Sequence, residues 1–396
     1  MLGRNSRRAG ISVDRPCDIL IAIAGRQHAD QLTAAMVENG WNAELRHTTA
    51  VRPQLTQVLA KHHQQHPLIG LIFRVGNRLL PNQVAEHIAF RMFARFDRKV
   101  SRALPNIAPK AVVVYETCAL ETLKAAKRLG LPTILDAASV HHSLQAMPDA
   151  ETPFRAGINA RKDAEIALAD HILCCSAFAA QSYIDAGVPK DRVHAIPLGF
   201  EAASFGPSPD ATLHRGPLRI AFAGRFTRVK GADLLADALA ALAARGLPFE
   251  CRIAAARADG DAQMIARLGR HAKLLGKVPH GELAELYRWA DILVMPSRFD
   301  SFGLVLLEAL ACGLPVLASD HVGASDFIVS GVNGDVVSSE DIEVMTGRLV
   351  EYATDPAPVR SMRAAAIASA QGADWSQYRI RVAQAVTAIL GWAERP

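Results

Sequence analysis

ILVMPSRFDSFGLVLLEALACGLPVLA, residues 292–318, reads as a strand, a helix and a second strand. The apolar run 292–295 has the length of a buried strand, residues 304–311 that of a short buried helix, and residues 315–318 that of a further strand. Parallel strands need a crossover connection, usually a helix, and this segment supplies one. It therefore predicts an α/β fold with a parallel sheet.

The same alternation extends through the second half of the chain. Strands are expected at residues 218–223 and 249–255, and helices at 231–245, 261–275, 282–289, 342–353 and 376–392. The first half repeats the pattern, with strands at 18–24, 68–75, 111–115, 133–136 and 172–176 and helices at 30–39, 120–129 and 161–170. We therefore expect two Rossmann-like, doubly wound domains with a ligand cleft between them.

Proline and glycine are concentrated in residues 195–217, which predicts a connector between the domains. The expected organisation is a flexible tail over 1–16, a first domain over 17–205, a second domain over 206–375 and a C-terminal helix over 376–396. A length of 396 residues agrees with two domains.

Composition and charge set limits on the class of protein. Half of the residues are apolar, 21% are charged, and the formal net charge of +5 is modest and gives no indication of nucleic-acid binding. Six dispersed cysteines indicate core residues in a reducing compartment, and neither a signal peptide nor a long uncharged apolar run is evident. We expect a cytoplasmic protein, either free or peripheral on the inner face of the cell membrane.

The segment AFAGRFTRVKG, residues 221–231, combines a strand end, a glycine turn and two cations. Gly224 lets the backbone approach a ligand, Arg225 can bind oxygens bidentately, and Lys230 adds a point charge before a helix N-terminus. Phosphate binding needs this combination of groups. A surface turn with solvated cations explains the segment equally well when it is taken alone.

Two carboxylates bracket the helix start expected near Leu304. Asp300 lies on the loop before the helix, and Glu308 lies one turn inside it. Carboxylates accept hydrogen bonds from sugar hydroxyls, whereas the free N–H groups of a helix start suit a phosphate. The arrangement suits Glu308 to a ribose and Asp300 to a transferred sugar.

The two segments together resemble the family 4 retaining glycosyltransferases of the GT-B fold. The matching residues are Gly224-Arg225, Lys230-Gly231, Pro296-Ser297, Asp300, Phe302-Gly303 and Glu308. The resemblance continues through residues 283–291, Gly323, Asn333-Gly334, Trp375 and Tyr378, so that it covers nearly the whole second half. Asp300 departs from the family, which usually has Glu there, and this leaves the donor sugar open.

The resemblance implies a donor site and a reaction. Arg225 and Lys230 would hold the donor diphosphate, Glu308 the ribose and Asp300 the sugar. The remaining implied donor-binding residues are Gly224, Ser301, Phe302, Gly303 and Leu304. The donor substrate would be a UDP- or GDP-sugar, and no metal or other cofactor would be needed. The acceptor would be a glycan, a lipid-linked molecule or a small molecule. The product would serve cell-envelope polysaccharide or glycolipid synthesis. The domain over 206–375 would bind the donor, and the last helix would cross back to the first domain.

The first domain resembles the acceptor domain of the same family more loosely. His141, after the strand at 133–136, is the candidate that would reach the reacting centre, with His142 as the second choice. Gly25 and His28 follow the first strand, where the family has a turn richer in glycine. By itself, a histidine in a loop is usually a solvated residue.

Three further features are interpreted as structural. Glu165 is expected on a solvated helix face, and Asp261 of the pair Asp259 and Asp261 is expected to cap a helix rather than bind a metal. The histidines of residues 62–66 precede Pro67, where polar residues at a helix end are ordinary.

The helix expected over residues 86–102 is amphipathic. Its cationic edge consists of Arg91, Arg95, Arg98 and Arg102, and its apolar face of Ile88, Met92, Phe96 and Val100. An ordinary surface helix and a helix that docks on an anionic membrane or a lipid-linked acceptor both fit this pattern.

Other functions remain open beside sugar transfer. A sugar-nucleotide-binding scaffold without turnover, and a GT-B epimerase or phosphorylase, share the architecture. A nicotinamide-dependent oxidoreductase is disfavoured because no Gly-x-Gly-x-x-Gly follows either opening strand.

Overall fold

The computed structural model describes residues 16–25, 27–80, 82–145, 152–208, 214–256, 262–339 and 341–393. The chain divides into two compact units. The first contains Met1–Asp136, Thr152–His171 and Val386–Pro396, and the second contains Ala137–Glu151 and Ile172–Ala385. The expected domain boundaries at residues 205 and 375 stay predictions.

The first half of the chain forms a seven-stranded sheet. Its strands are β1 (Ile19–Ile23), β2 (Ala43–His47), β3 (His63–Gln65), β4 (Ala111–Tyr115), β5 (Thr133–Ala137), β6 (His171–Cys174) and β7 (Val193–Ala195). They lie in the order β3-β2-β1-β4-β5-β6-β7, and β1 pairs in parallel with both β2 and β4. Every residue of β1 and β4 is buried, as expected for central strands of a parallel sheet.

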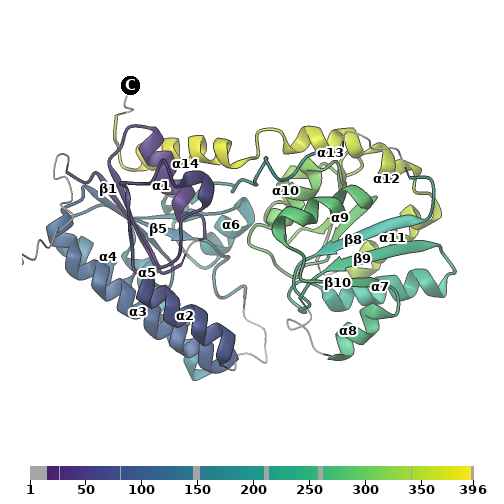
Figure 1. Ribbon diagram of the computed structural model, residues 1–396, viewed down its shortest axis with the longest axis horizontal. Helices are drawn as coiled ribbons and strands as arrows, with labels where there is room; N and C mark the ends of the chain where they lie inside the picture. The colour runs from purple at the N-terminus through teal and green to yellow at the C-terminus, as the bar shows by residue number, and fades with distance from the viewer. Residues whose placement is uncertain are drawn as a thin grey trace, which may run out of the picture. The chain divides into compact units, whose positions relative to one another are not determined.

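Helices connect these strands. They are α1 (Ala29–Glu38), α2 (Pro67–Leu79), α3 (Asn82–Ile107), α4 (Leu120–Arg128), α5 (Pro153–Leu168) and α6 (Ala177–Asp185). Figure 1 shows α2 lying along α3, the helix that comes next in the chain. The apolar face predicted for residues 86–102 is half-buried at Ile88 and Met92 and fully buried at Phe96 and Val100, and the arginines of its edge are exposed.

The strand predicted at residues 68–75 is wrong, because this segment lies within helix α2. Pro67 occupies the first turn of the helix, where its missing N–H costs nothing. The apolar residues recur at helical spacing, and a short apolar run of this length does not distinguish a strand from a helix. The strand instead consists of His63–Gln65, the polar residues interpreted above as a helix end.

The second sheet has six strands. They are β8 (Leu218–Ala223), β9 (Phe249–Ala254), β10 (Lys273–Gly276), β11 (Ile292–Met295), β12 (Val316–Ser319) and β13 (Gly334–Val337). Their order is β10-β9-β8-β11-β12-β13, with parallel pairing. The helices of this half are α7 (Ala232–Ala244), α8 (Ala262–Gly269), α9 (Leu283–Trp289), α10 (Leu304–Ala311), α11 (Ile342–Thr354), α12 (Ala357–Ser361), α13 (Arg363–Ala370) and α14 (Trp375–Ile389). Two parallel sheets covered by helices confirm the predicted α/β class.

The helix predicted over residues 261–275 is too long. It ends at Gly269, and Lys273–Gly276 forms the edge strand β10. The apolar residues on both sides of Gly269 fit a single helical period in the sequence. In the structure, those before Gly269 belong to α8, and those after it belong to β10, which pairs with β9.

Glu165 is a second correction, since its carboxylate is fully buried rather than solvated. It accepts hydrogen bonds from the backbone N–H groups of Thr117, Ala119 and Leu120 at 2.6–3.0 Å and forms an ion pair with Arg161 at 3.1 Å. These N–H groups belong to the start of α4, so Glu165 caps that helix from another element. Burial raises the pKa of Glu165 to about 7.

All six cysteines are buried and none forms a disulfide. Within the described residues, no helix has the length and the apolar content that a membrane span requires. The Asp259 and Asp261 pair lies outside the described residues.

Candidate active site

The order of the second sheet places a topological switch point between β8 and β11. The chain winds outward from β8 through β9 to β10 on one side, and from β11 through β12 to β13 on the other. Ligands of open parallel sheets bind where the winding reverses, at the carboxyl ends of the strands. The loops that leave β8 and β11 carry the two segments identified in the sequence.

Two glycines in these loops allow close approaches that a side chain would block. Gly231 has a φ of 69° at the start of α7, and a Cβ there would lie 1.8 Å from the carbonyl oxygen of Pro296. Gly303 has a φ of 86° at the start of α10, and a Cβ would lie 2.8 Å from Cγ1 of Val322. A side chain at Gly231 would force the two loops apart, and a side chain at Gly303 would collide with Val322, which follows β12.

The two loops line one cavity of about 370 Å³ in the second unit. The predicted residues that line it are Gly224, Arg225, Lys230, Asp300, Ser301, Phe302, Gly303 and Leu304. Ala138, Leu198, Phe222 and Met295 contribute apolar wall. Eight of the nine residues predicted to bind the donor therefore share one cavity, and the ninth is Glu308.

An ion pair links the two loops inside this cavity. Nζ of Lys230 lies 2.7 Å from Oδ2 of Asp300, and both side chains are partly exposed. Outside it, Arg298 donates two hydrogen bonds of 2.8 Å to the carboxylate of Asp233, and the Arg298 N–H donates to the carbonyl of Val229 at 2.8 Å. Arg298 thus connects the β11 loop to the loop that carries Lys230, a contact that no sequence motif predicts.

Hydrogen bonds also hold the backbone before α10. The Asp300 N–H donates to the carbonyl of His321, and the Gly323 N–H donates to the carbonyl of Asp300, at 2.8 and 2.9 Å. The Ser301 hydroxyl accepts from the Val140 N–H at 3.1 Å, and the Ser301 carbonyl accepts from the Ser176 hydroxyl at 2.7 Å. The first N–H groups of α10 have no partner within the helix and suit an anionic ligand.

Glu308 lies one turn inside α10 and is buried, and it is not among the residues that line the cavity. Oε1 lies 2.7 Å from Nε2 of His280, and Oε2 accepts a hydrogen bond of 3.2 Å from the Tyr287 hydroxyl. Burial raises the pKa of Tyr287 well above its ordinary value, so that it stays a donor. The sequence analysis missed both partners, since nothing in their spacing connects them with Glu308.

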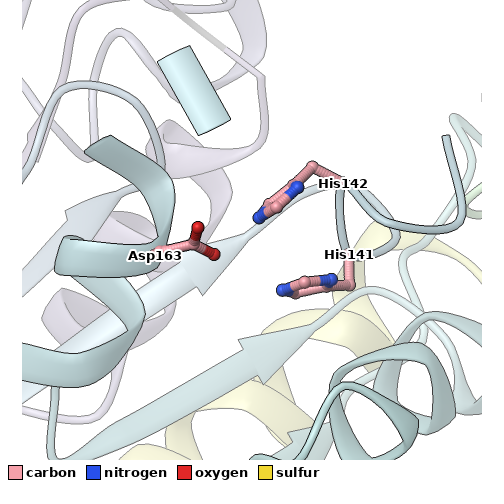
Figure 2. A group of neighbouring side chains, drawn as sticks. All are labelled: His141, His142 and Asp163. Atoms are coloured by element: carbon pink, nitrogen blue, oxygen red, sulfur yellow. The ribbon is translucent and has the colours of Figure 1, made fainter. Parts of the chain in front are cut away.

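His141 and His142 follow β5 on a loop of the second unit. Figure 2 shows their rings lying against each other, with centroids 4.2 Å apart. His141 is buried: its Nδ1 lies 2.8 Å from the Ser143 hydroxyl, and its N–H donates to the Ser182 hydroxyl at 2.8 Å. Asp163, also drawn in that view, belongs to α5 of the first unit.

Gly25 and His28 lie in the first unit, after β1. Nε2 of His28 is 2.9 Å from Oδ2 of Asp136, and both side chains are buried. The Gly25 carbonyl accepts a hydrogen bond of 3.0 Å from the Thr49 hydroxyl. The proposed acceptor residues are thus shared between the two units.

Comparisons with known proteins identify relatives of the chain. Residues 209–371 match the profile of the family described as glycosyl transferases group 1. The chain is 32% identical over 282 residues to D-inositol 3-phosphate glycosyltransferase 1 of Catenulispora acidiphila, covering 64% of this chain and 67% of the relative. Two further curated relatives are matched over 49% and 52% of their length.

Solved structures are similar to the chain in fold. Sucrose-phosphate synthase from Thermosynechococcus elongatus has a TM-score of 0.69 and 19% identity, covering 94% of this chain and 99% of that structure. The Anabaena protein HepE in complex with UDP has a TM-score of 0.64 and 17% identity, covering 94% and 100%.

The two parallel sheets with their helices define the GT-B fold class. The chain belongs to the glycosyl transferases group 1 family.

Proposed function

We propose that the chain transfers a sugar from a UDP- or GDP-sugar to an acceptor with retention of the anomeric configuration. The observation that carries this proposal is the cavity in which Arg225, Lys230 and the start of α10 converge beside the carboxylate of Asp300. Cations and N–H groups suit a diphosphate, and the carboxylate suits sugar hydroxyls. The UDP bound to HepE supports a nucleotide donor.

The chemistry follows from where charge develops. As the bond between the sugar and the diphosphate breaks, positive charge grows on the sugar and negative charge on the departing diphosphate. Arg225, Lys230 and the α10 amides stabilise that negative charge, so the proposed reaction requires no metal and no other cofactor. The diphosphate takes the proton of the acceptor hydroxyl as the new glycosidic bond forms, which leaves no protein base necessary on that face.

Glu308 and His141 have separate proposed roles. Glu308 accepts hydrogen bonds from the donor ribose, which requires its contact with His280 to open. His141 and His142, with Gly25 and His28, contact the acceptor. We assign residues 17–205 to the acceptor domain, residues 206–375 to the donor domain, and residues 376–396 to the segment that returns to the acceptor domain.

The acceptor class and location are proposed from the family. The acceptor is a glycan, a lipid-linked molecule or a small molecule, and the product serves cell-envelope polysaccharide or glycolipid synthesis on the cytoplasmic side. The relatives named for D-inositol 3-phosphate make phosphorylated polyols worth including among the acceptors tested.

A donor panel tests the proposal. UDP- and GDP-sugars are screened for thermal stabilisation of the full chain, since a ligand that binds only the folded state raises Tm. The stabilising donors are then assayed for hydrolysis and transfer, with and without EDTA. One donor that stabilises and turns over in EDTA is expected. A donor that binds without hydrolysis or transfer would indicate a scaffold, and stabilisation by none would contradict the proposal.

A further inference from the structure

Helix α2 exposes an apolar face. Leu68, Leu71, Ile72, Val75 and Leu79 are all exposed, Leu68 by 68% and Leu79 by 72%. Their spacing places them on one side of the helix, and α2 contains no acidic residue. A helix on the surface of a protein ordinarily turns such a face toward the core.

The opposite side of α2 is the side that packs. Gly70 is buried there and Gly76 is buried on the flank of the helix, and a Cβ at Gly70 would lie 2.0 Å from the carbonyl oxygen of Thr48. A Cβ at Gly76 would meet Cγ2 of Ile88, on α3, at 3.9 Å. The helix is therefore held by its glycine side, and the apolar side cannot turn inward without losing this close approach. A contiguous exposed apolar face of this kind marks an interaction surface.

Positive charge accompanies this face. Arg74 on α2 and Arg91, Arg95, Arg98 and Arg102 on α3 are exposed. The two acids of α3 offset little of this charge, because Asp97 is fully buried and paired with Arg161. Residues 67–107 contain seven Lys or Arg and two acids, a net of +5, which equals the formal charge of the whole chain. The net positive charge of the chain is thus concentrated in the α2–α3 hairpin.

We propose that the α2–α3 hairpin is a docking surface for an anionic lipid membrane. The apolar face of α2 enters the boundary between headgroups and acyl chains, and the arginines contact anionic headgroups. The charge of the hairpin favours an anionic membrane over two other occupants. A second copy of the chain would bring two arginine-rich hairpins together, and like charges repel. Residues 1–15 contain four arginines and one acid, so this segment is also positively charged. The proposal is independent of which donor and acceptor the enzyme uses.

Vesicle co-sedimentation tests the proposal on the full chain. Phosphatidylcholine vesicles are compared with vesicles that contain phosphatidylglycerol, at low and high salt. Binding is expected only to the anionic vesicles and is expected to weaken with salt, because the screening length falls. Equal binding to both vesicles, or binding to neither, would overturn the proposal.

Two double variants separate the apolar and the charged contributions. L71S/V75S removes part of the apolar face and is expected to weaken binding at least tenfold. R91Q/R95Q is expected to weaken it about 30-fold, from about 1 kcal/mol per arginine near an anionic surface. The matched controls V329S/V332S and R270Q change exposed residues of the second unit and are expected to bind as the wild type does.

Each variant is first checked by circular dichroism and thermal unfolding, so that loss of binding is not loss of fold. Wild-type binding by both double variants would overturn the proposal. So would a dimer in sedimentation velocity that L71S/V75S dissociates, because the face would then be covered by a second copy.

A fluorescent probe reports insertion directly. The native cysteines are all buried, so a cysteine introduced at Leu71 can be labelled selectively with an environment-sensitive dye. Anionic vesicles are expected to shift its emission to the blue, and a probe at Val332 is expected not to shift. An unshifted probe at Leu71 would overturn the insertion of α2.

Discussion

Lys230 and Asp300, seventy positions apart in the chain, form an ion pair of 2.7 Å in the candidate donor cavity. The cation proposed to bind the diphosphate and the carboxylate proposed to contact the sugar are thus partners in this cavity. A donor that binds between them must exchange this contact for its own. Substitutions of Lys230 and Asp300 should therefore have different effects on the affinity for the diphosphate.

Asp300→Asn removes the charge of the carboxylate and releases Lys230 without a large change of volume. We expect this variant to bind the free nucleoside diphosphate at least as tightly as the wild type, while kcat/KM for transfer falls about 100-fold. Lys230→Ala should weaken diphosphate binding and lower transfer by a similar factor. Calorimetry and initial rates measure both effects. An equal loss of diphosphate affinity in the two variants would contradict the separate roles.

Substitutions of Glu308 and His280 should have different effects on the use of the donor. Glu308→Ala is expected to lower kcat/KM about 100-fold, because a ribose contact is lost. His280→Ala is expected to leave donor affinity unchanged or to improve it, since His280 occupies Oε1 of Glu308 and must yield to the ribose. Donor KM and kcat are the readouts. Equal losses from the two substitutions would show that His280 supports the site rather than occupying it.

Gly231→Ala should destabilise the protein by about 3 kcal/mol or more, because its Cβ would collide with the Pro296 carbonyl. Gly246→Ala is the matched control: Gly246 has nearly the same φ, 66° against 69°, but has open space around it. Backbone strain alone should cost it about 1 kcal/mol. Urea unfolding measures both values. Similar losses would mean that contact between the two loops adds nothing.

His47 predicts a pH dependence of stability. Burial lowers the pKa of His47 to about 4, and its ring contacts the Thr49 carbonyl and His63. The unfolded state, with a pKa of about 6.5, therefore binds more protons between pH 4 and 6.5. The stability contributed by the neutral His47 side chain should be fully present above pH 6.5 and should fall by up to about 3 kcal/mol toward pH 4. Unfolding followed across this range should show a smaller fall for His47→Gln, and an unchanged fall would contradict the assignment.

The loops that line the candidate donor cavity could be placed from the sequence because their residues lie in short, ordered segments. The strand at 292–295 and the helix at 304–311 agree with β11 and α10, and the loop between them carries its chemistry within a few residues. Where a strand, a glycine turn and a helix follow one another, the local pattern and the tertiary structure agree.

The sequence-based predictions were wrong or incomplete where contacts between distant residues determine the structure. Residues 68–75 have the composition of a strand, but they lie in a helix whose apolar side is exposed and whose Gly70 lies against the Thr48 backbone. Glu165 resembles a solvated helix residue, and only the folded chain brings it to the N–H groups of α4. The partners of Glu308 lie 28 and 21 positions away, and no spacing rule connects them with it.

The contribution of Arg225 to nucleotide affinity tests most directly whether this cavity binds the donor diphosphate. Arg225 lines the cavity, whereas Arg228, three positions along the same loop, does not. In calorimetric titrations with UDP and GDP, Arg225→Ala should weaken the nucleotide that binds the wild type at least tenfold, and Arg228→Ala should leave its affinity within about twofold. Equal affinities of the wild type and Arg225→Ala, or a loss confined to Arg228→Ala, would contradict the assignment of this cavity to the donor diphosphate.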